Sequence, residues 1–209
     1  MSKYFNFFPK TLYTSDEVNS DTITQLTSRF NFTEDFKNNS AVSYEYDIQE
    51  GDTPEIIADK LYGSSERHWI VLLFNDIIDP QFDWPLSQRT LISFIDEKYS
   101  ANANVGQSGT NWSKSHIQAY YQVETRTTNS SGSKLVNKIQ VDANTYANVV
   151  SSSQSILLPD TNTITVTISK ETQTYYDYEI ETNESKRTIK LLRPEFASVA
   201  EAEFRSVIT

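Results

Sequence analysis

The chain has 209 residues, enough for one medium domain or two small ones. Its 18 basic and 28 acidic residues give a formal net charge of −10. This charge argues against binding to nucleic acid or to an anionic membrane surface, because both interactions need a basic face on the protein. There is no cysteine, so a disulfide framework, a thiolate metal site and a cysteine nucleophile are all excluded.

Much of the apolar bulk comes from 12 tyrosines and 11 phenylalanines. Such side chains either form an ordinary core or bury part of their surface against partners, and composition leaves both interpretations open. The N-terminus lacks the long apolar segment of a signal peptide. The longest unbroken apolar run, residues 69–74, is far shorter than the ~20 residues that span a bilayer. We therefore expect the chain to be made and folded in a cytosol.

Residues 1–43 are expected to form a partly extended N-terminal arm, with a short helix near 33–39. This segment is too short to bury its own phenylalanines. They must therefore pack on the rest of the chain or on another chain. The arm residues expected at a partner interface are Phe5, Phe7, Phe8 and Pro9.

Residues 44–99 are expected to form a strand–helix–helix–strand module. Apolar and polar side chains alternate over residues 44–50, which is the pattern of a half-buried strand, and Gly51 ends it. The run at 90–95 is expected to be the returning strand. Between them lies a rigid loop, because a residue before proline is pushed out of the helical region. The loop residues expected at a partner interface are Asp79, Pro80 and Trp84.

The first helix of the module has two possible N-caps. If Asp52 is the cap, Glu55 falls at the third helical position and completes a capping box. If Thr53 is the cap, Pro54 falls at the first helical position, where its missing N–H costs nothing. Gly63 is expected to end this helix in the left-handed conformation. The second helix is apolar on every face, so it should be buried on more than one side.

The remaining chain divides into three expected parts. Residues 100–111 have the composition of a linker. Residues 112–192 are expected to form an inserted antiparallel β region with a turn at 129–133, and residues 193–209 a C-terminal helix. The strand candidates are residues 117–127, 135–141, 163–169, 175–181 and 187–192. Together these elements predict an α+β fold.

No catalytic constellation emerges from the sequence. The only histidines are His68 and His116, and a lone histidine is more often a packed or surface residue than a catalyst. There is no nucleophile elbow, dinucleotide fingerprint or P-loop. Asp76, Asp79 and Asp83 cluster without the spacing of a calcium loop and are interpreted as helix-end and turn residues. We expect no catalytic residue, cofactor, metal or small-molecule substrate.

Residues 46–63 resemble the opening of a LysM module, which begins with a strand, a Gly-Asp-Thr turn, an Ile-Ala pair and a Tyr-Gly stop. The second helix fits the same family loosely. The residues that carry this resemblance are Gly51, Asp52, Thr53, Ile57, Ala58, Tyr62, Gly63, Trp69, Leu72 and Asn75.

A closer resemblance is to the baseplate wedge subunit family of T-even-type contractile-tailed phages, which carries a LysM-like fold. It rests on spaced matches along the module and at both chain ends: Tyr62-Gly63, residues 68–73, Asn75-Asp76, Asp79-Pro80, Trp84, Ser87-Gln88, the Phe7-Phe8-Pro9 cluster and Arg187-x-Ile189-Lys190. Residues 112–182 match nothing in that pattern. The resemblance implies a non-enzymatic virion protein of the tail baseplate. It would bind other wedge proteins and neighbouring wedges, with hub and sheath-initiating proteins as further candidates, and help join wedges around the hub.

The alternative function is LysM-type binding of peptidoglycan or chitin. In that family the sugar lies between the turn after the first strand and the loop after the second helix, here residues 51–53 and 76–88. Trp84 in the second loop could stack on a sugar or anchor a protein interface. A peptidoglycan hydrolase is a weaker third hypothesis, because no catalytic set accompanies the module.

Overall fold

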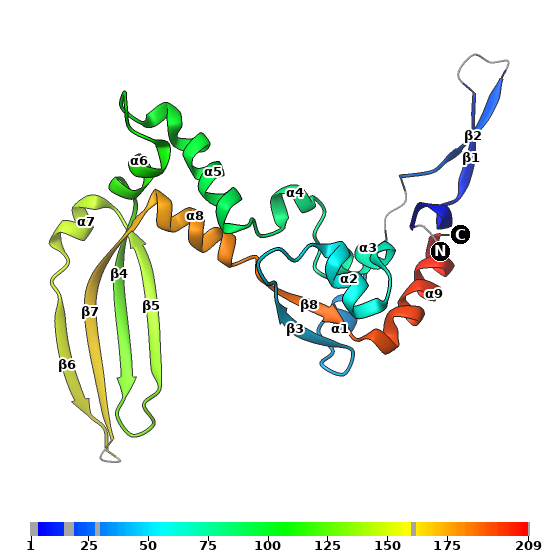
Figure 1. Cartoon of the computed structure of the whole chain (residues 1–209). Coiled ribbons are helices and arrows are strands. Elements are labelled where there is room, and N and C mark those ends of the chain that lie inside the picture. Colours follow the sequence, from blue (N-terminus) through cyan, green and yellow to red (C-terminus); the bar gives the residue numbers. More distant parts are fainter. Residues whose placement is uncertain (1–3, 15–18, 28–29, 160–161, 209) are drawn as a thin grey trace. The chain divides into compact units, whose positions relative to one another are not determined.

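The computed structural model describes residues 4–14, 19–27, 30–159 and 162–208, and at Phe5 and Asn6 the backbone alone. The fold is α+β, as expected, and internal contacts divide it into two units (Figure 1). Unit 1 combines Met1–Ser87 with Asn183–Thr209, and unit 2 is Gln88–Thr182. Unit 2 is therefore an insertion into the chain of unit 1. Among the described residues, no helix has the length and apolar character needed to cross a membrane.

Unit 1 is built from short elements taken from both ends of the chain. From the first segment these are η1 (Tyr4–Phe7), β1 (Lys10–Thr14), β2 (Ser20–Thr24), α1 (Glu34–Lys37), β3 (Ser43–Asp47), α2 (Pro54–Tyr62), η2 (Ser65–Arg67), α3 (His68–Phe74) and α4 (Pro80–Asp83). From the second segment they are β8 (Thr188–Leu192), η4 (Pro194–Phe196) and α9 (Ala197–Ile208). The helices expected near 33–39 and at the C-terminus are confirmed as α1 and α9.

The strand that pairs with β3 comes from a distant part of the sequence. β3 and β8 are antiparallel, with Ser43 opposite Leu192 and Asp47 opposite Thr188. The expected returning strand at 90–95 is wrong, since those residues lie in helix α5 (Gln88–Tyr99). Its buried residues, Leu91, Ile95 and Tyr99, recur every four positions, which is a helical spacing. β8 lies within the range expected to be β-rich but completes unit 1.

Helix α2 begins and ends as its sequence allows. Thr53 is the N-cap, because its hydroxyl accepts a hydrogen bond from the amide of Ile56 at 3.3 Å, and Pro54 takes the first helical position. Gly63 has φ +69°, a conformation that costs glycine little, and its amide donates to the carbonyl of Asp59. The choice between Asp52 and Thr53 is thereby settled for Thr53.

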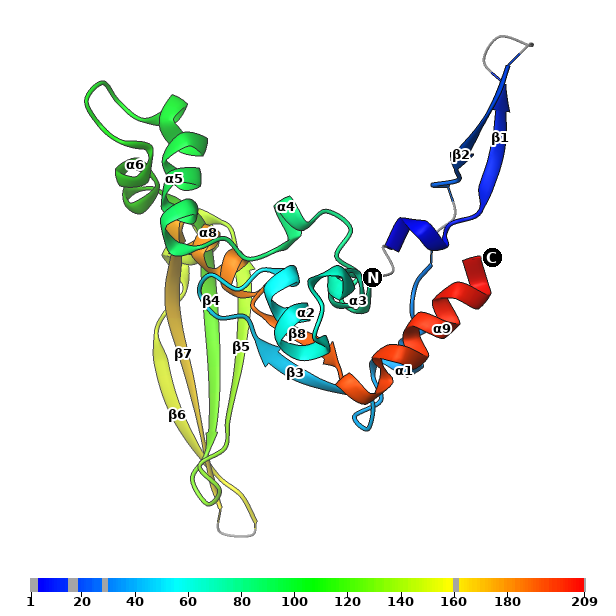
Figure 2. The same ribbon diagram turned by 45° about the vertical axis from the view of Figure 1, so that its right-hand side comes forward.

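The core of unit 1 is one cluster that draws on both chain segments. It joins the buried face of α2 and α3 to β8, α9 and the aromatic residues of the N-terminal segment. Its largest fully buried side chains are Phe74, Phe204, Ile70, Leu191, Leu192 and Val71. β1 and β2 pair antiparallel (Figure 2), and nearly all of their residues are exposed. This strand pair was not foreseen from the sequence.

Unit 2 combines helices with a four-stranded antiparallel sheet. Its elements are α5 (Gln88–Tyr99), η3 (Ser100–Asn102), α6 (Gly109–Ser115), β4 (Ile117–Thr128), β5 (Lys134–Val141), α7 (Ala143–Asn148), β6 (Ser152–Leu157), β7 (Thr163–Thr174) and α8 (Tyr175–Glu184), whose last two residues belong to unit 1. The sheet order is β5-β4-β7-β6 (Figure 1). The strands expected at 117–127, 135–141 and 163–169 and the turn at 129–133 are confirmed, whereas β6 and α7 were missed.

Two sequence expectations in unit 2 are wrong. The strand expected at 175–181 is helix α8, and Thr174 and Asp177 cap it reciprocally: the Thr174 hydroxyl accepts from the Asp177 amide at 3.1 Å, and the Asp177 carboxylate accepts from the Thr174 amide at 3.3 Å. The expected linker at 100–111 contains η3 and the start of α6, where Ser108 accepts from the Asn111 amide at 3.2 Å. Both helices therefore begin at a residue that caps them, Thr174 for α8 and Ser108 for α6, although the composition of these segments favours a strand and a linker.

Candidate functional site

The Gly-Asp-Thr turn after β3 is organised around the buried carboxylate of Asp52. It accepts hydrogen bonds from the Tyr46 hydroxyl at 2.7 Å, from Lys60 Nζ at 2.8 Å and from the Gln49 amide at 3.2 Å. Burial alone would raise the pKa of Asp52, but the bonds from Lys60, Tyr46 and Gln49 outweigh it and hold the pKa below its usual range. The hydrogen bond between Tyr46 and Asp52 also raises the pKa of Tyr46 to about 12, because the carboxylate holds the hydroxyl proton.

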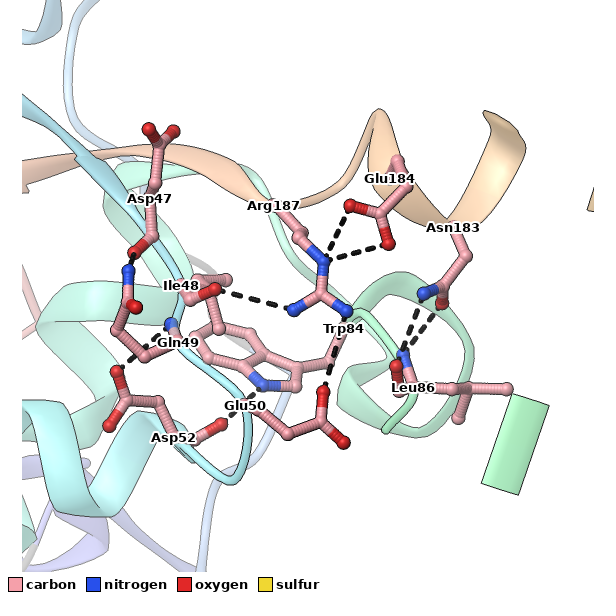
Figure 3. Close-up of polar contacts among 10 residues, drawn as sticks. All are labelled: Asp47, Ile48, Gln49, Glu50, Asp52, Trp84, Leu86, Asn183, Glu184 and Arg187. Atoms are coloured by element: carbon pink, nitrogen blue, oxygen red, sulfur yellow. Dashed lines mark hydrogen bonds and ion pairs between the residues drawn. The ribbon is translucent and has the colours of Figure 1, made fainter. Parts of the chain in front are cut away.

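Trp84 closes the turn from the other side. Its indole Nε1 donates to the backbone carbonyl of Asp52 at 3.0 Å, and only 9% of the side chain is exposed (Figure 3). Trp84 therefore binds the loop before unit 2 to the turn after β3. Its ring face is buried within unit 1, which leaves little of it for a sugar or a protein partner.

Arg187 joins the end of β3 to the start of β8. Its Nε donates to both carboxylate oxygens of Glu184 at 2.9 and 2.8 Å, and Nη1 donates to the carbonyl of Ile48 at 3.3 Å (Figure 3). Nη2 lies 3.5 Å from the Glu50 carboxylate, and the carbonyl of Arg187 accepts from the Ile48 amide at 2.9 Å. The bond to Glu184 is the main reason that the pKa of Arg187 is raised. These groups line a polar hollow of about 530 Å³.

Asn183 holds the place where the chain leaves unit 1 and returns to it. Its Oδ1 accepts from the Leu86 amide at 2.7 Å and its Nδ2 donates to the Leu86 carbonyl at 3.1 Å (Figure 3). Lys186 Nζ also donates to the carbonyl of Phe82 at 2.5 Å. Asn183 is buried, so water cannot satisfy its side-chain amide, and the two bonds to Leu86 supply the partners that it needs. Nothing in the sequence around Asn183 indicated this role.

Asn75, the residue at which α3 ends, makes a second contact of the same kind. Its side-chain amide bonds to the backbone N–H and carbonyl of Lys190 on β8, at 2.7 and 2.8 Å. Tyr62, another LysM-like signature residue, donates its hydroxyl to the carbonyl of Leu192 at 3.0 Å. Tyr62 and Asn75 therefore both bind β8, the strand that pairs with β3.

The acidic residues after α3 are used within the chain. The carboxylate of Asp76 accepts from Lys37 Nζ at 2.5 Å and from Asn31 Nδ2 at 2.8 Å, and the bond to buried Lys37 is the main cause that lowers its pKa. Asp79 caps α4, and the Asp83 carboxylate accepts from the Asp79 amide at 3.2 Å. In the described part of the chain, no group of three or more histidine or acidic side chains is placed to hold a metal.

The aromatic residues expected to reach a partner instead pack largely on their own chain. Phe8 is buried, with its ring centroid 6.0 Å from that of Phe204 on α9. Tyr4 stacks on Phe204 at 5.0 Å, and half-buried Phe7 lies under the guanidinium of Arg205 at 4.3 Å. The side chain of Phe5 lies outside the described residues, and Pro9 is half-buried. Asp79 and Pro80, by contrast, are exposed.

These contacts define an α+β structural module held together by buried aromatic rings and side-chain amides. Residues 3–201 match the family described as Base plate wedge protein 53. The chain therefore belongs to the baseplate wedge protein 53 family. It is also similar to baseplate wedge protein gp53 of Enterobacteria phage T4, with 30% identity over 146 residues, which cover 68% of this chain and 66% of that relative. The match thus spans about two thirds of the relative's length.

Proposed function

We propose that this chain is a structural protein of the phage tail baseplate, where it binds other wedge proteins and helps join adjacent wedges around the hub. The observation that carries the proposal is the family match over residues 3–201. The T4 relative is by its name a baseplate wedge protein. The role is non-enzymatic, and it is supported by a site whose polar side chains are engaged in holding the fold together.

The surface that best supports wedge binding is the loop and helix after α3. Ile78 and Phe82 are 78% and 67% exposed there, beside the exposed Asp79-Pro80 pair. Large apolar side chains exposed next to each other are a common mark of protein interfaces. Since Trp84 and Phe8 are buried in the chain itself, we place the partner contact on Ile78, Asp79, Pro80 and Phe82.

We also infer that β3, α2, α3 and β8 form a LysM-like module, in which the second strand is supplied after the insertion. Support comes from the capped start of α2 at Thr53, its left-handed stop at Gly63 and the contacts from Tyr62 and Asn75 to β8. The proposed resemblance lies in the strand–helix–helix–strand order and in these residues.

Glycan binding is the less favoured function of such a module. Residues 51–53 and the loop before unit 2 are drawn together by the bond from Trp84 to Asp52, so the indole occupies space between them. A pull-down with chitin or peptidoglycan tests this directly. We expect no retention of the chain, and specific retention would favour the glycan function over ours.

The wedge role is tested by co-expressing the chain with the other baseplate wedge proteins of the same phage. We expect co-purification, and the double variant Ile78→Asp/Phe82→Asp should abolish it, because two charges replace the apolar contact. Ile56→Asp is the matched control, since Ile56 is also exposed but lies on α2. A wild-type chain that stays monomeric and folded beside every wedge protein would refute the role. Equal loss in the control would refute the assigned surface.

A further inference from the structure

Strand β7 has alternating apolar and polar side chains, and the chain itself does not fully bury the apolar ones. Ile164, Val166 and Ile168 alternate with threonines, which is the pattern of a strand buried on one face. In the structure these three side chains are only partly buried. The sequence pattern of β7 therefore predicts that its isoleucine and valine side chains are more deeply buried than they are in the structure.

The sheet register gathers further apolar residues on the same face. Arg126 of β4 lies opposite both Val166 and Leu135, so Leu135 of β5 shares the face of Val166. Ile156 of β6 lies opposite Ile164 in the same way. The apolar members of this face, called here the isoleucine face, are Leu135, Ile139, Ile156, Ile164, Val166 and Ile168.

The opposite face of the sheet has a different character. It carries Thr165 and Thr167 of β7 with Ser153 and Ser155 of β6, and the hydroxyls of Ser153 and Ser155 lie 3.3 and 3.2 Å from those of Thr167 and Thr165. Such hydroxyl pairs are well solvated and satisfied across neighbouring strands. Val136 and Leu157 are also exposed on this opposite face, but the isoleucine face gathers more apolar residues and would gain more from being covered.

Helix α7 covers one end of the isoleucine face. The Tyr146 ring lies 4.8 Å from the ring of Tyr120, and Lys170 Nζ donates to the carbonyl of Ala147 at 3.0 Å. Toward the other end, where β4 turns into β5 (Figure 1), Leu135 is 65% exposed. The exposed part of the face therefore begins where α7 ends.

We infer that the isoleucine face is a contact between two copies of this chain, packed sheet against sheet. Its charges are self-complementary: Glu124 and Arg126 lie two residues apart on the same face of β4, 2.7 Å apart as an ion pair. A twofold axis between two such faces places the acid of one copy near the base of the other. Sheets packed face to face bury alternating apolar residues of this kind.

The size of the face sets the strength of this contact. The strands have 12, 8, 6 and 12 residues in β4, β5, β6 and β7. At about 3.3 Å per residue and about 4.8 Å between strands, the sheet face covers about 600 Å². Leaving out the end under α7, about 400 Å² per copy remains, or about 800 Å² for the pair, which is the size of a weak, transient interface. We therefore expect a dimer that forms at micromolar or higher concentration and dissociates on dilution. This inference does not depend on the wedge role.

Sedimentation velocity of the full chain over a wide concentration range tests the dimer. We expect a reversible shift from monomer to dimer, and Leu135→Asp should weaken it on the order of tenfold or more, since it places a charge in the apolar contact. Val136→Asp is the matched control, because Val136 is the next residue, is 50% exposed and points to the opposite face. Circular dichroism checks that both variants fold.

A charge exchange identifies the second copy as the occupant. Arg126→Glu gives a face with two carboxylates and Glu124→Arg a face with two guanidinium groups, so each alone should fail to dimerise. Mixed together, the two variants should form a heterodimer. A wild-type chain that remains monomeric at every concentration would overturn the inference, whether or not another protein covers the face. So would equal effects of the two aspartate variants, or no association in the mixture.

Discussion

The side-chain amide of Asn75 pairs with the backbone of Lys190 in both directions, accepting from its N–H at 2.7 Å and donating to its carbonyl at 2.8 Å. The two residues are separated by the whole of unit 2 in sequence. Asn75 therefore fixes the position of β8 on the helical half of the module. Asn183 makes the equivalent contact with Leu86 where the chain crosses between the units.

We expect Asn75→Ala to destabilise the chain by about 1–3 kcal/mol, because the N–H and carbonyl of Lys190 lose their side-chain partner. Urea unfolding followed by circular dichroism measures this change. Asn148→Ala is a suitable control, since Asn148 is exposed and its side chain donates to the carbonyl of Asn144 within α7, and it should change stability by less than about 0.5 kcal/mol. Equal effects of both variants would mean that the contact with β8 adds nothing.

Asp52 makes unit 1 sensitive to acid. Its pKa in the folded chain lies below the ordinary value of about 3.9, so the unfolded chain binds the proton more readily. The stability supplied by the carboxylate is fully present above that ordinary pKa and is lost as pH falls through the lowered folded value. Asp52→Asn should therefore unfold at lower urea at neutral pH and show a shallower loss of stability in acid.

The control for this pH dependence is Asp59→Asn, because Asp59 is exposed on α2, the helix that follows Asp52 in the chain. Unfolding of the three proteins is compared in urea from neutral to acid pH. The wild-type chain and the control should converge toward the Asp52→Asn variant as the pH falls. A variant that loses stability in acid as steeply as the wild-type chain would show that Asp52 is not the group responsible.

Gly109 lies where α6 meets α5 at close range. A methyl group at this position would overlap the carbonyl oxygen of Asp96 and lie 2.8 Å from the amide nitrogen of Ser100. Because both atoms belong to backbone, Gly109→Ala should destabilise unit 2 by about 1–3 kcal/mol or more. Thermal unfolding measures the loss, with Asn111→Ala, exposed on α6, as the control that should remain near wild type.

Unit 1 should fold without its insertion. The bonds of Asn183 to Leu86 show that the two crossing points are adjacent, so a short Gly/Ser linker can replace residues 88–182. We expect a soluble protein with dispersed amide signals in a two-dimensional NMR spectrum. Adding Asn183→Ala to the shortened chain should lower its melting temperature. Aggregation of the shortened chain would show instead that unit 2 is needed for folding.

The start of the module could be predicted because its signals are local. The alternation along β3, the cap at Thr53 and the left-handed stop at Gly63 depend on neighbouring residues only. The helix α5 could not be distinguished from a strand by its β-branched and aromatic content, although Leu91, Ile95 and Tyr99 carry a helical period. The cap of α8 at Thr174 is likewise a local signal, since Thr174 and Asp177 are three residues apart in sequence.

The sequence by itself determined the α+β class, the first strand and the two helices that follow it in the module, and the family resemblance, because these depend on local pattern and on spaced residues. Tertiary structure alone decided that β8 closes the module, that Trp84 fills the space beside Asp52, and that Phe8 is buried on Phe204. These pairings join residues far apart in sequence, and no local propensity specifies a partner across such a distance. These pairings form only when distant segments fold together, because they then bury apolar surface and satisfy hydrogen-bonding groups that no single segment could bury or satisfy alone.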